Sequence, residues 1–257
     1  MPAVTVDLWH TLIYLSPADE DAYMNHQFAL GEEVLRVSAL LPGAPKLSDA
    51  ELGRAFEKAY VDAVTESNEG RTVTPSEQVR RASQATGRVA NPEEYLSRLR
   101  AEVDRTPFRS APGAVSLLRA LRSAGYHVGV ISNTIGEPGS FLRPVLTKMG
   151  FDRYVEAYVF SDEHAWTKPA PEIFLYALEQ VHERPEDAVH VGDGWSDLEG
   201  ARRAGFRGSV LFTGLRSYGE RYRQLFRPGA PKDSPSGLRV DTLREVVPVV
   251  RKLLPPG

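Results

Sequence analysis

Five short runs of apolar, mostly β-branched residues stand out along the chain, and small or polar residues follow them. Near-continuous apolar runs of this length are typical of strands covered on both faces, as in a parallel sheet. The four stronger runs are VTVD (4–7), HVGVIS (127–132), AVHVG (188–192) and SVLFT (209–213), and YVEAYVF (154–160) is a weaker fifth. The hydrophobic pattern therefore predicts a buried sheet.

Helical patterns separate these strands. Residues 112–125 open with Pro-Gly and close with Gly, and residues 169–181 repeat apolar positions with a helical period. Ser196 and Glu199 have the spacing of a capping box, which predicts that a helix begins there. Strands that alternate with helices predict an α/β fold with a doubly wound, Rossmann-like parallel sheet.

One long stretch breaks the alternation. Residues 15–107 contain several helical patterns, with Ser48 and Glu51 spaced as at a helix N-terminus, and no convincing strand. We therefore expect two domains: an α/β core formed by residues 1–14 and 108–257, and an α-helical cap domain formed by residues 15–107. Such an insert after the first strand is expected to cover the edge of the sheet where ligands bind.

Composition narrows the class of protein. The 257 residues are 42% hydrophobic and 25% charged, as in ordinary globular proteins. A net charge of −3 gives no reason to expect a nucleic-acid or membrane partner, and the basic segment 216–232 is expected to be a solvated helix and loop. The chain has no cysteine, no long apolar run and no signal-peptide pattern, so a cytoplasmic location is expected.

Polar side chains follow the predicted strands at the points where ligands bind in open α/β sheets. Taken singly, each would be read as a turn former, a helix cap or a solvated charge, but they recur in order on four strand ends. They are Asp7 and Thr11, Ser132 and Asn133, Lys168, and the pair Asp193 and Asp197.

These residues stand in motifs that resemble those of the haloacid dehalogenase superfamily of hydrolases with a helical (C1-type) cap. The motifs read DLWHT (7–11), ISN (131–133), TKPAPEIF (167–174) and GDGWSD (192–197). The resemblance covers the core, whereas the helical insert matches the family's cap in position only.

The resemblance implies a hydrolase whose carboxylate nucleophile, Asp7, forms a covalent aspartyl-phosphate that water then hydrolyses. It also implies Mg²⁺, which would neutralise the charge between this carboxylate and an anionic phosphate. Asp7, the backbone carbonyl of Trp9 and Asp193 would hold the metal, with Asp197 behind them or as an occasional direct ligand.

The remaining motif residues would act on the substrate or on the nucleophile. Ser132, with Asn133 beside it, would hold phosphate oxygens of a small phosphorylated metabolite. Lys168 would offset the negative charge and keep Asp7 ionised, and Thr11 would orient the nucleophile loop.

Trp9 departs from the family pattern. The family's phosphatases carry an aspartate two residues after the nucleophile, which protonates the leaving group, and an indole cannot shuttle a proton. His10 and the acids Asp19, Glu20 and Asp21 are candidates to replace it, although the acids also suit the start of a helix. An acyl or aryl phosphate would need no acid. Trp9 and His10 are further candidates for substrate contact.

Two other functions remain open. Metal-independent 2-haloacid dehalogenases carry an aromatic residue at the position of Trp9, but they carry a neutral residue at the position of Asp193. A third interpretation is a catalytically impaired binding protein, although retention of Ser132 and Lys168 argues against it. Metal-dependent phosphatase chemistry is favoured, because three neighbouring carboxylates with one lysine call for a cation.

Overall fold

A computed structural model describes residues 1–226 and 238–255 of the chain. Its centre is a six-stranded sheet in the order β10-β9-β8-β1-β6-β7, in which all the paired strands are parallel. The strands are β1 (Ala3–Asp7), β6 (His127–Ser132), β7 (Ala157–Phe160), β8 (Ala188–Gly192), β9 (Gly208–Phe212) and β10 (Arg239–Val240). The predicted α/β fold is confirmed, and all five predicted strands are present.

The strand order reverses at β1, which lies between β6 and β8. Val4 pairs with Val128 on one side and with Val189 on the other, so β1 is central and all five of its residues are buried. The carboxyl ends of β1, β6 and β8 therefore meet at one edge, which is where ligands bind in such sheets.

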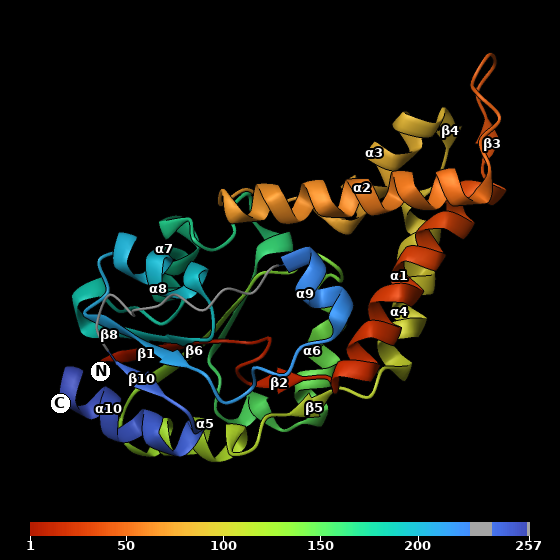
Figure 1. Cartoon of the computed structure of the whole chain (residues 1–257). Helices are drawn as coiled ribbons and strands as arrows, with labels where there is room; N and C mark the ends of the chain where they lie inside the picture. The colour runs from red at the N-terminus through yellow and green to blue at the C-terminus, as the bar shows by residue number, and fades with distance from the viewer. Residues whose placement is uncertain (227–237, 256–257) are drawn as a thin grey trace.

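Helices cover both faces of the sheet (Figure 1). The helices α5 (Ala114–Ser123), α6 (Gly139–Lys148) and α10 (Val246–Leu253) contribute to one apolar cluster, and α7 (Pro171–Gln180) and α8 (Trp195–Arg203) contribute to another. The predicted capping box of Ser196 and Glu199 is wrong. Helix α8 begins one residue earlier, and the carboxylate of Asp197 accepts the backbone N–H of Gly194.

Between β1 and β6 the chain forms a helical insert of α1 (Pro17–Val37), α2 (Asp49–Asn68), α3 (Pro75–Thr86) and α4 (Pro92–Arg105). The insert has its own apolar cluster, which includes Phe56, Tyr95 and Leu99. The predicted capping box of Ser48 and Glu51 is present at the start of α2. No helix in the described ranges is both long and apolar enough to cross a membrane.

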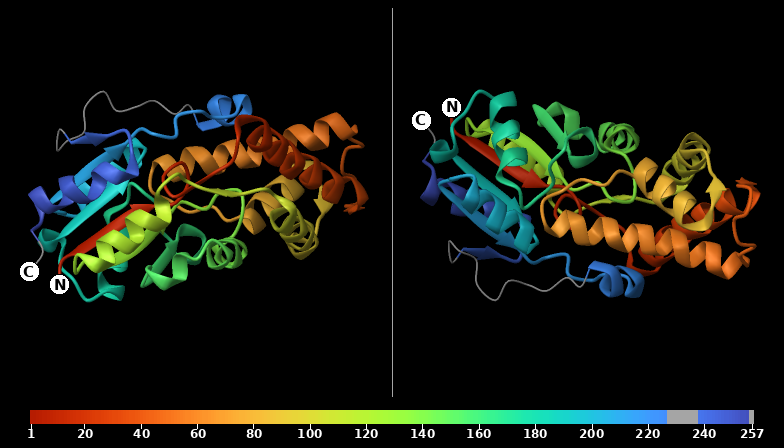
Figure 2. Two further views of the ribbon diagram at one scale, coloured as in Figure 1. Left: turned by 90° about the horizontal axis from the view of Figure 1, so that it is seen from below. Right: turned by 90° about the horizontal axis from the view of Figure 1, so that it is seen from above.

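Two short antiparallel strand pairs frame the insert. β3 (Ala39–Leu40) pairs with β4 (Arg88–Val89), a two-residue ladder that the helical pattern of the sequence does not reveal. β2 (Ile13–Tyr14) pairs with β5 (Arg109–Ser110), which holds the two connections between the sheet and the insert side by side. The sheet and the insert lie end to end (Figure 2).

After β9 the chain turns back onto the insert. This returning segment (residues 214–226) contains α9 (Glu220–Phe226), which packs against α1 and α2 (Figures 1 and 2). The rings of Tyr222 and Phe226 join the apolar cluster of the insert. The expectation of a solvated helix therefore holds for one face of residues 216–226 and is wrong for the face that packs on the insert, and residues 227–232 lie outside the described ranges.

Candidate active site

A cavity of about 890 Å³ is lined both by residues at the carboxyl edge of the sheet and by residues of the insert. Seven of the residues singled out from the sequence motifs line it: Asp7, Trp9, Ser132, Asn133, Lys168, Asp193 and Asp197. They come from three strand ends and the loop after β7, so the parallel topology alone brings them together. Thr11 and His10 are not part of the cavity wall.

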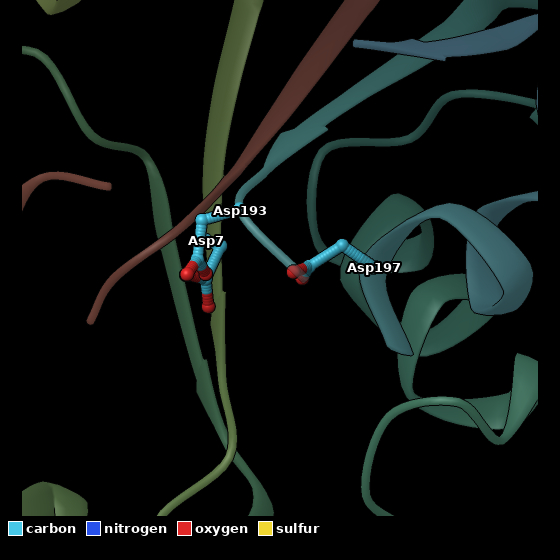
Figure 3. A group of neighbouring side chains, drawn as sticks. All are labelled: Asp7, Asp193 and Asp197. Atoms are coloured by element: carbon cyan, nitrogen blue, oxygen red, sulfur yellow. The ribbon is translucent and has the colours of Figure 1, made fainter. Parts of the chain in front are cut away.

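Three carboxylates of the cavity lining lie near one another (Figure 3). Asp7 ends β1, Asp193 follows β8, and Asp197 lies in the first turn of α8. One oxygen of each lies within 4.8 Å of an oxygen of the others.

Lys168 joins two of these carboxylates. Its Nζ donates to Asp7 Oδ1, to Asp197 Oδ1 at 2.7 Å and to the carbonyl of Ile131 at 3.1 Å. Burial alone would lower the pKa of Lys168, but the charges of Asp197 and Asp7 outweigh it and raise that pKa. The ammonium therefore stays charged beside Asp7.

Asp197 is fully occupied by donors. Besides Lys168, His190 Nε2 lies 3.1 Å from Oδ1, and the N–H of Gly194 donates to Oδ2 at 3.0 Å. Burial acts to raise the pKa of Asp197, but Lys168 and His190 outweigh it and hold the pKa well below its usual range. A Cβ at Gly192 would lie 2.2 Å from Cγ of Asp197, so only glycine leaves room for this carboxylate.

Asp193 has no ion-pair partner among the described residues, and for Asp7 the bond from Lys168 does not outweigh burial. Thr11 Oγ1 donates to Asp7 Oδ2 at 3.1 Å, and the hydroxyl of Tyr218 donates to Asp193 Oδ2 at 3.1 Å. Burial, followed for Asp193 by repulsion from Asp7, raises the pKa of both carboxyls. Two neighbouring carboxylates that repel one another, one buried and one partly buried, are the oxygen donors that a divalent cation favours, so these residues fit a Mg²⁺ ion.

Ser132 and Asn133 differ in what they can offer a ligand. The amide of Asn133 bonds both to the backbone N–H of Lys168, at 2.8 Å, and to its carbonyl, at 2.9 Å. Asn133 thus fixes the loop that presents Lys168. The hydroxyl of Ser132 makes only a 3.5 Å contact with the neighbouring carbonyl and remains available at the cavity wall.

His10 is buried away from the cavity. It adopts a left-handed backbone (φ 57°), and its ring packs edge-on against Tyr218 and Tyr222. Its Nε2 lies 3.1 Å from Glu20 Oε1. Burial lowers the pKa of His10, but Glu20 and Asp193 outweigh it and raise that pKa. The geometry supports neither a substrate contact nor a catalytic role for His10.

The three acids at the start of α1 already accept hydrogen bonds from other groups of the protein. Asp19 accepts from Ser16 and Arg109, as expected for a helix start. Asp21 accepts the backbone N–H groups of Glu220 and Arg221 in the returning segment. Of the three acids, Glu20 lines the cavity, and it already contacts His10 and accepts the N–H of Gly219.

A fifth carboxyl group, missed by the sequence analysis, lies in the cavity wall beside the three aspartates and Glu20. Glu137 follows β6 and accepts from Trp9 Nε1 at 3.1 Å and from the hydroxyl of Tyr23 at 3.2 Å. Burial raises the pKa of Glu137 to about 7, although hydrogen bonds from Tyr23, Trp9 and Gln27 oppose this. No sequence motif marks Glu137, because two of its partners lie in the insert.

Comparison with known proteins agrees with this geometry. The fold is a Rossmann-like α/β fold with an acidic site at the carboxyl edge of a parallel sheet. The family model for haloacid dehalogenase-like hydrolases matches residues 1–205. The chain belongs to this family.

Curated relatives match part of the chain. Phosphoglycolate phosphatase 1 of Pseudomonas aeruginosa is 31% identical over 137 residues, which are 53% of this chain and 46% of the relative. Glyceraldehyde 3-phosphate phosphatase of Pyrococcus furiosus is 35% identical over 103 residues, 40% and 42% of the two chains. The matched stretches therefore span about half the length of these relatives.

Solved structures share the fold over nearly the whole chain. A predicted phosphoglycolate phosphatase from Haemophilus somnus has a TM-score of 0.62 at 19% identity and covers 97% of this chain and 98% of its own. A dehalogenase solved as an intermediate complex has a TM-score of 0.58 at 18% identity, with 97% and 96% covered. Phosphatases and dehalogenases are thus both found among structures with this fold.

Proposed function

We propose that the protein is a Mg²⁺-dependent phosphatase that hydrolyses a small phosphorylated metabolite through an aspartyl-phosphate on Asp7. The observation that carries the proposal is Asp193. It lies beside Asp7 without a basic partner in ion-pair range among the described residues, which suits a cation and not a metal-free site. The phosphatases among the curated relatives support the same reaction class.

Asp7 is the nucleophile in this proposal. One of its carboxylate oxygens attacks phosphorus, the bond from phosphorus to the ester oxygen breaks, and the leaving oxygen takes a proton from water to depart as the alcohol. Water then attacks the aspartyl-phosphate and releases inorganic phosphate. Thr11 and Lys168 each hold one oxygen of Asp7, which fixes the direction of the carboxylate. The hydroxyl of Ser132 binds a phosphate oxygen.

The metal would be held by Asp7, Asp193 and the backbone carbonyl of Trp9, and when bound it neutralises the charge between the nucleophile and the phosphate. Asp197 has both Lys168 and His190 at one oxygen and the N–H of Gly194 at the other, so we assign it to holding Lys168 in place, not to direct ligation.

The helical insert acts as the cap domain in this proposal, with residues 15–107 as the cap and residues 1–14 and 108–257 as the core. Tyr23, Tyr60 and Ser67 of the insert line the cavity opposite the carboxylates. These side chains would contact the part of the substrate that is not phosphate.

The proposal is tested by phosphate release at pH 7, with Mg²⁺ and with EDTA. We expect Mg²⁺-dependent hydrolysis of para-nitrophenyl and acetyl phosphate that the substitution Asp7→Asn abolishes. Because Trp9 supplies no proton, alkyl phosphates should react more slowly by roughly 10²–10⁴, the usual contribution of a general acid.

Two other results would contradict the proposal. Release of halide from chloroacetate without metal would make the protein a dehalogenase and overturn the proposal. Absence of both reactions while Mg²⁺ binds would favour a binding protein.

A further inference from the structure

Glu137 is a buried carboxyl group in the wall of the cavity, separate from the three aspartates. Its side chain is 5% exposed and comes from the loop between β6 and α6. It follows Ser132, the proposed phosphate contact, by five positions. The same cavity therefore holds a site for an anion at the sheet edge and a second, acidic position.

Only neutral groups donate to Glu137. Trp9 Nε1 donates to Oε1, the hydroxyl of Tyr23 donates to Oε2, and the amide of Gln27 also contributes a hydrogen bond. No basic side chain of the described residues forms an ion pair with Glu137. The negative charge of Asp162 adds repulsion. When Glu137 is ionised, its charge therefore has no cationic partner in contact, and a buried carboxylate in that state is unfavourable.

Three basic residues line the cavity, and none of them forms an ion pair with Glu137. Lys168 contacts Asp7 and Asp197, and Arg223 pairs with Glu220 at 2.7 Å. Arg216 is exposed, and its charge acts to lower the pKa of Tyr218, whose hydroxyl donates to Asp193. Within the described part of the chain, no positive charge is therefore in contact with Glu137.

The loop that carries Glu137 is firmly held. Gln78 of α3 donates to the carbonyl of Ile135 at 2.7 Å, and Asp162 accepts from Thr134 at 2.6 Å and from the N–H of Gly139 at 2.9 Å. Hydrogen bonds on both sides of Glu137 thus fix the backbone that holds this residue in the cavity wall.

From this we propose that Glu137 binds an ammonium group of the substrate, and that the substrate is the phosphate monoester of a primary amine, such as an amino alcohol or an amino sugar. The inference rests on the proposed phosphatase function. The phosphate lies at Ser132 and Lys168, and the ammonium supplies the positive charge that the neutral donors around Glu137 cannot. A hydroxyl in the same place would add a further hydrogen bond and leave the charge uncompensated.

Matched substrate pairs test the inference with Mg²⁺ at pH 7. Phosphoethanolamine is compared with 2-hydroxyethyl phosphate, and glucosamine 6-phosphate with glucose 6-phosphate, so that within each pair an amine replaces a hydroxyl. We expect kcat/KM to favour the amine at least ~10-fold in one pair, as for a lost charge contact in a buried site. In Glu137→Gln this preference should disappear, whereas the exposed control Glu186→Gln should keep it.

Binding provides a readout that needs no turnover. Calorimetric titration of Asp7→Asn with the same four esters should show tighter binding of the amine than of the hydroxyl compound. The double variant Asp7→Asn, Glu137→Gln should bind both members of each pair equally. Equal values for amine and hydroxyl in both pairs, or a preference that survives Glu137→Gln, would overturn the inference. Hydrolysis of para-nitrophenyl phosphate is measured in parallel, and its absence would instead contradict the phosphatase function.

Discussion

Two aspartates of one short motif have opposite surroundings. Asp197 is surrounded by Lys168, His190 and a backbone N–H, whereas Asp193 has a single tyrosine hydroxyl and the repulsion of Asp7. The spacing GDGWSD could predict that both acids lie near the nucleophile. It could not predict this difference, because His190 points from inside β8 and Lys168 comes from another loop.

Glu137 gives a prediction about stability and pH. Its pKa in the folded protein, about 7, lies above the ordinary 4.5, so the folded state binds more protons between these values. The free energy of unfolding therefore falls as pH rises from about 4.5 to about 7 and changes little beyond. Glu137→Gln should remove this loss.

Urea denaturation at pH 5 and pH 8 measures the effect. The stability of Glu137→Gln relative to wild type should improve by up to about 2–3 kcal/mol between the two pH values. The exposed control Glu186→Gln has no burial to relieve and should show no such change. A pH-independent difference would show that Glu137 is not held in an unfavourable charged state.

The elements of the sheet were predictable because each buried strand carries its own apolar signal. The carboxyl ends of parallel strands must meet, so strand ends alone brought Asp7, Ser132 and Asp193 to one site. The role of α9 was not predictable. Its short basic, aromatic sequence suits solvent equally well, and only the partners Asp21 and Phe28 on the insert explain why it packs.

The docking of α9 depends on Gly219. A Cβ there would lie 2.5 Å from Asp21 Oδ1 and 2.9 Å from the backbone carbonyl of Pro17. Gly219→Ala should push α9 off α1, destabilise the protein by about 1–3 kcal/mol and expose Arg221 and Arg223 to trypsin. Limited proteolysis followed by mass spectrometry detects these cuts.

Gly53→Ala is the matched control. Its Cβ would meet the end of the flexible Glu32 side chain at 2.9 Å, and it lies within α2. That substitution should stabilise the helix by roughly 0.5–1 kcal/mol and leave trypsin cleavage unchanged. Equal cleavage of Gly219→Ala and wild type would mean that α9 docks without this close approach.

At the scale of the whole molecule, the proposed metal links the site to global stability. A ligand at 100 times its Kd stabilises the folded state by roughly 2.7 kcal/mol, so Mg²⁺ should raise the Tm of the wild type. Asp193→Asn should remove that rise. Without metal this variant should be more stable than wild type at pH 8, since its repulsion with Asp7 is gone.

Scanning calorimetry with Mg²⁺, with EDTA and with NaCl of equal ionic strength separates specific binding from charge screening. An equal rise in Tm for wild type and Asp193→Asn would place the ion elsewhere or show that the effect is one of screening.

The returning segment also changes the mechanics of the molecule. The adjacent strands β2 and β5 carry the two connections between the sheet and the insert, and a rotation of the insert is expected to pivot there. Gly219 donates its N–H to Glu20 across 199 positions of the chain. Together with the bonds from α9 to Asp21, this contact ties the returning segment to α1. Any rotation that separates α1 from the sheet must first break these hydrogen bonds. The speed at which a ligand enters or a product leaves is then set by residues that never touch the reacting phosphate.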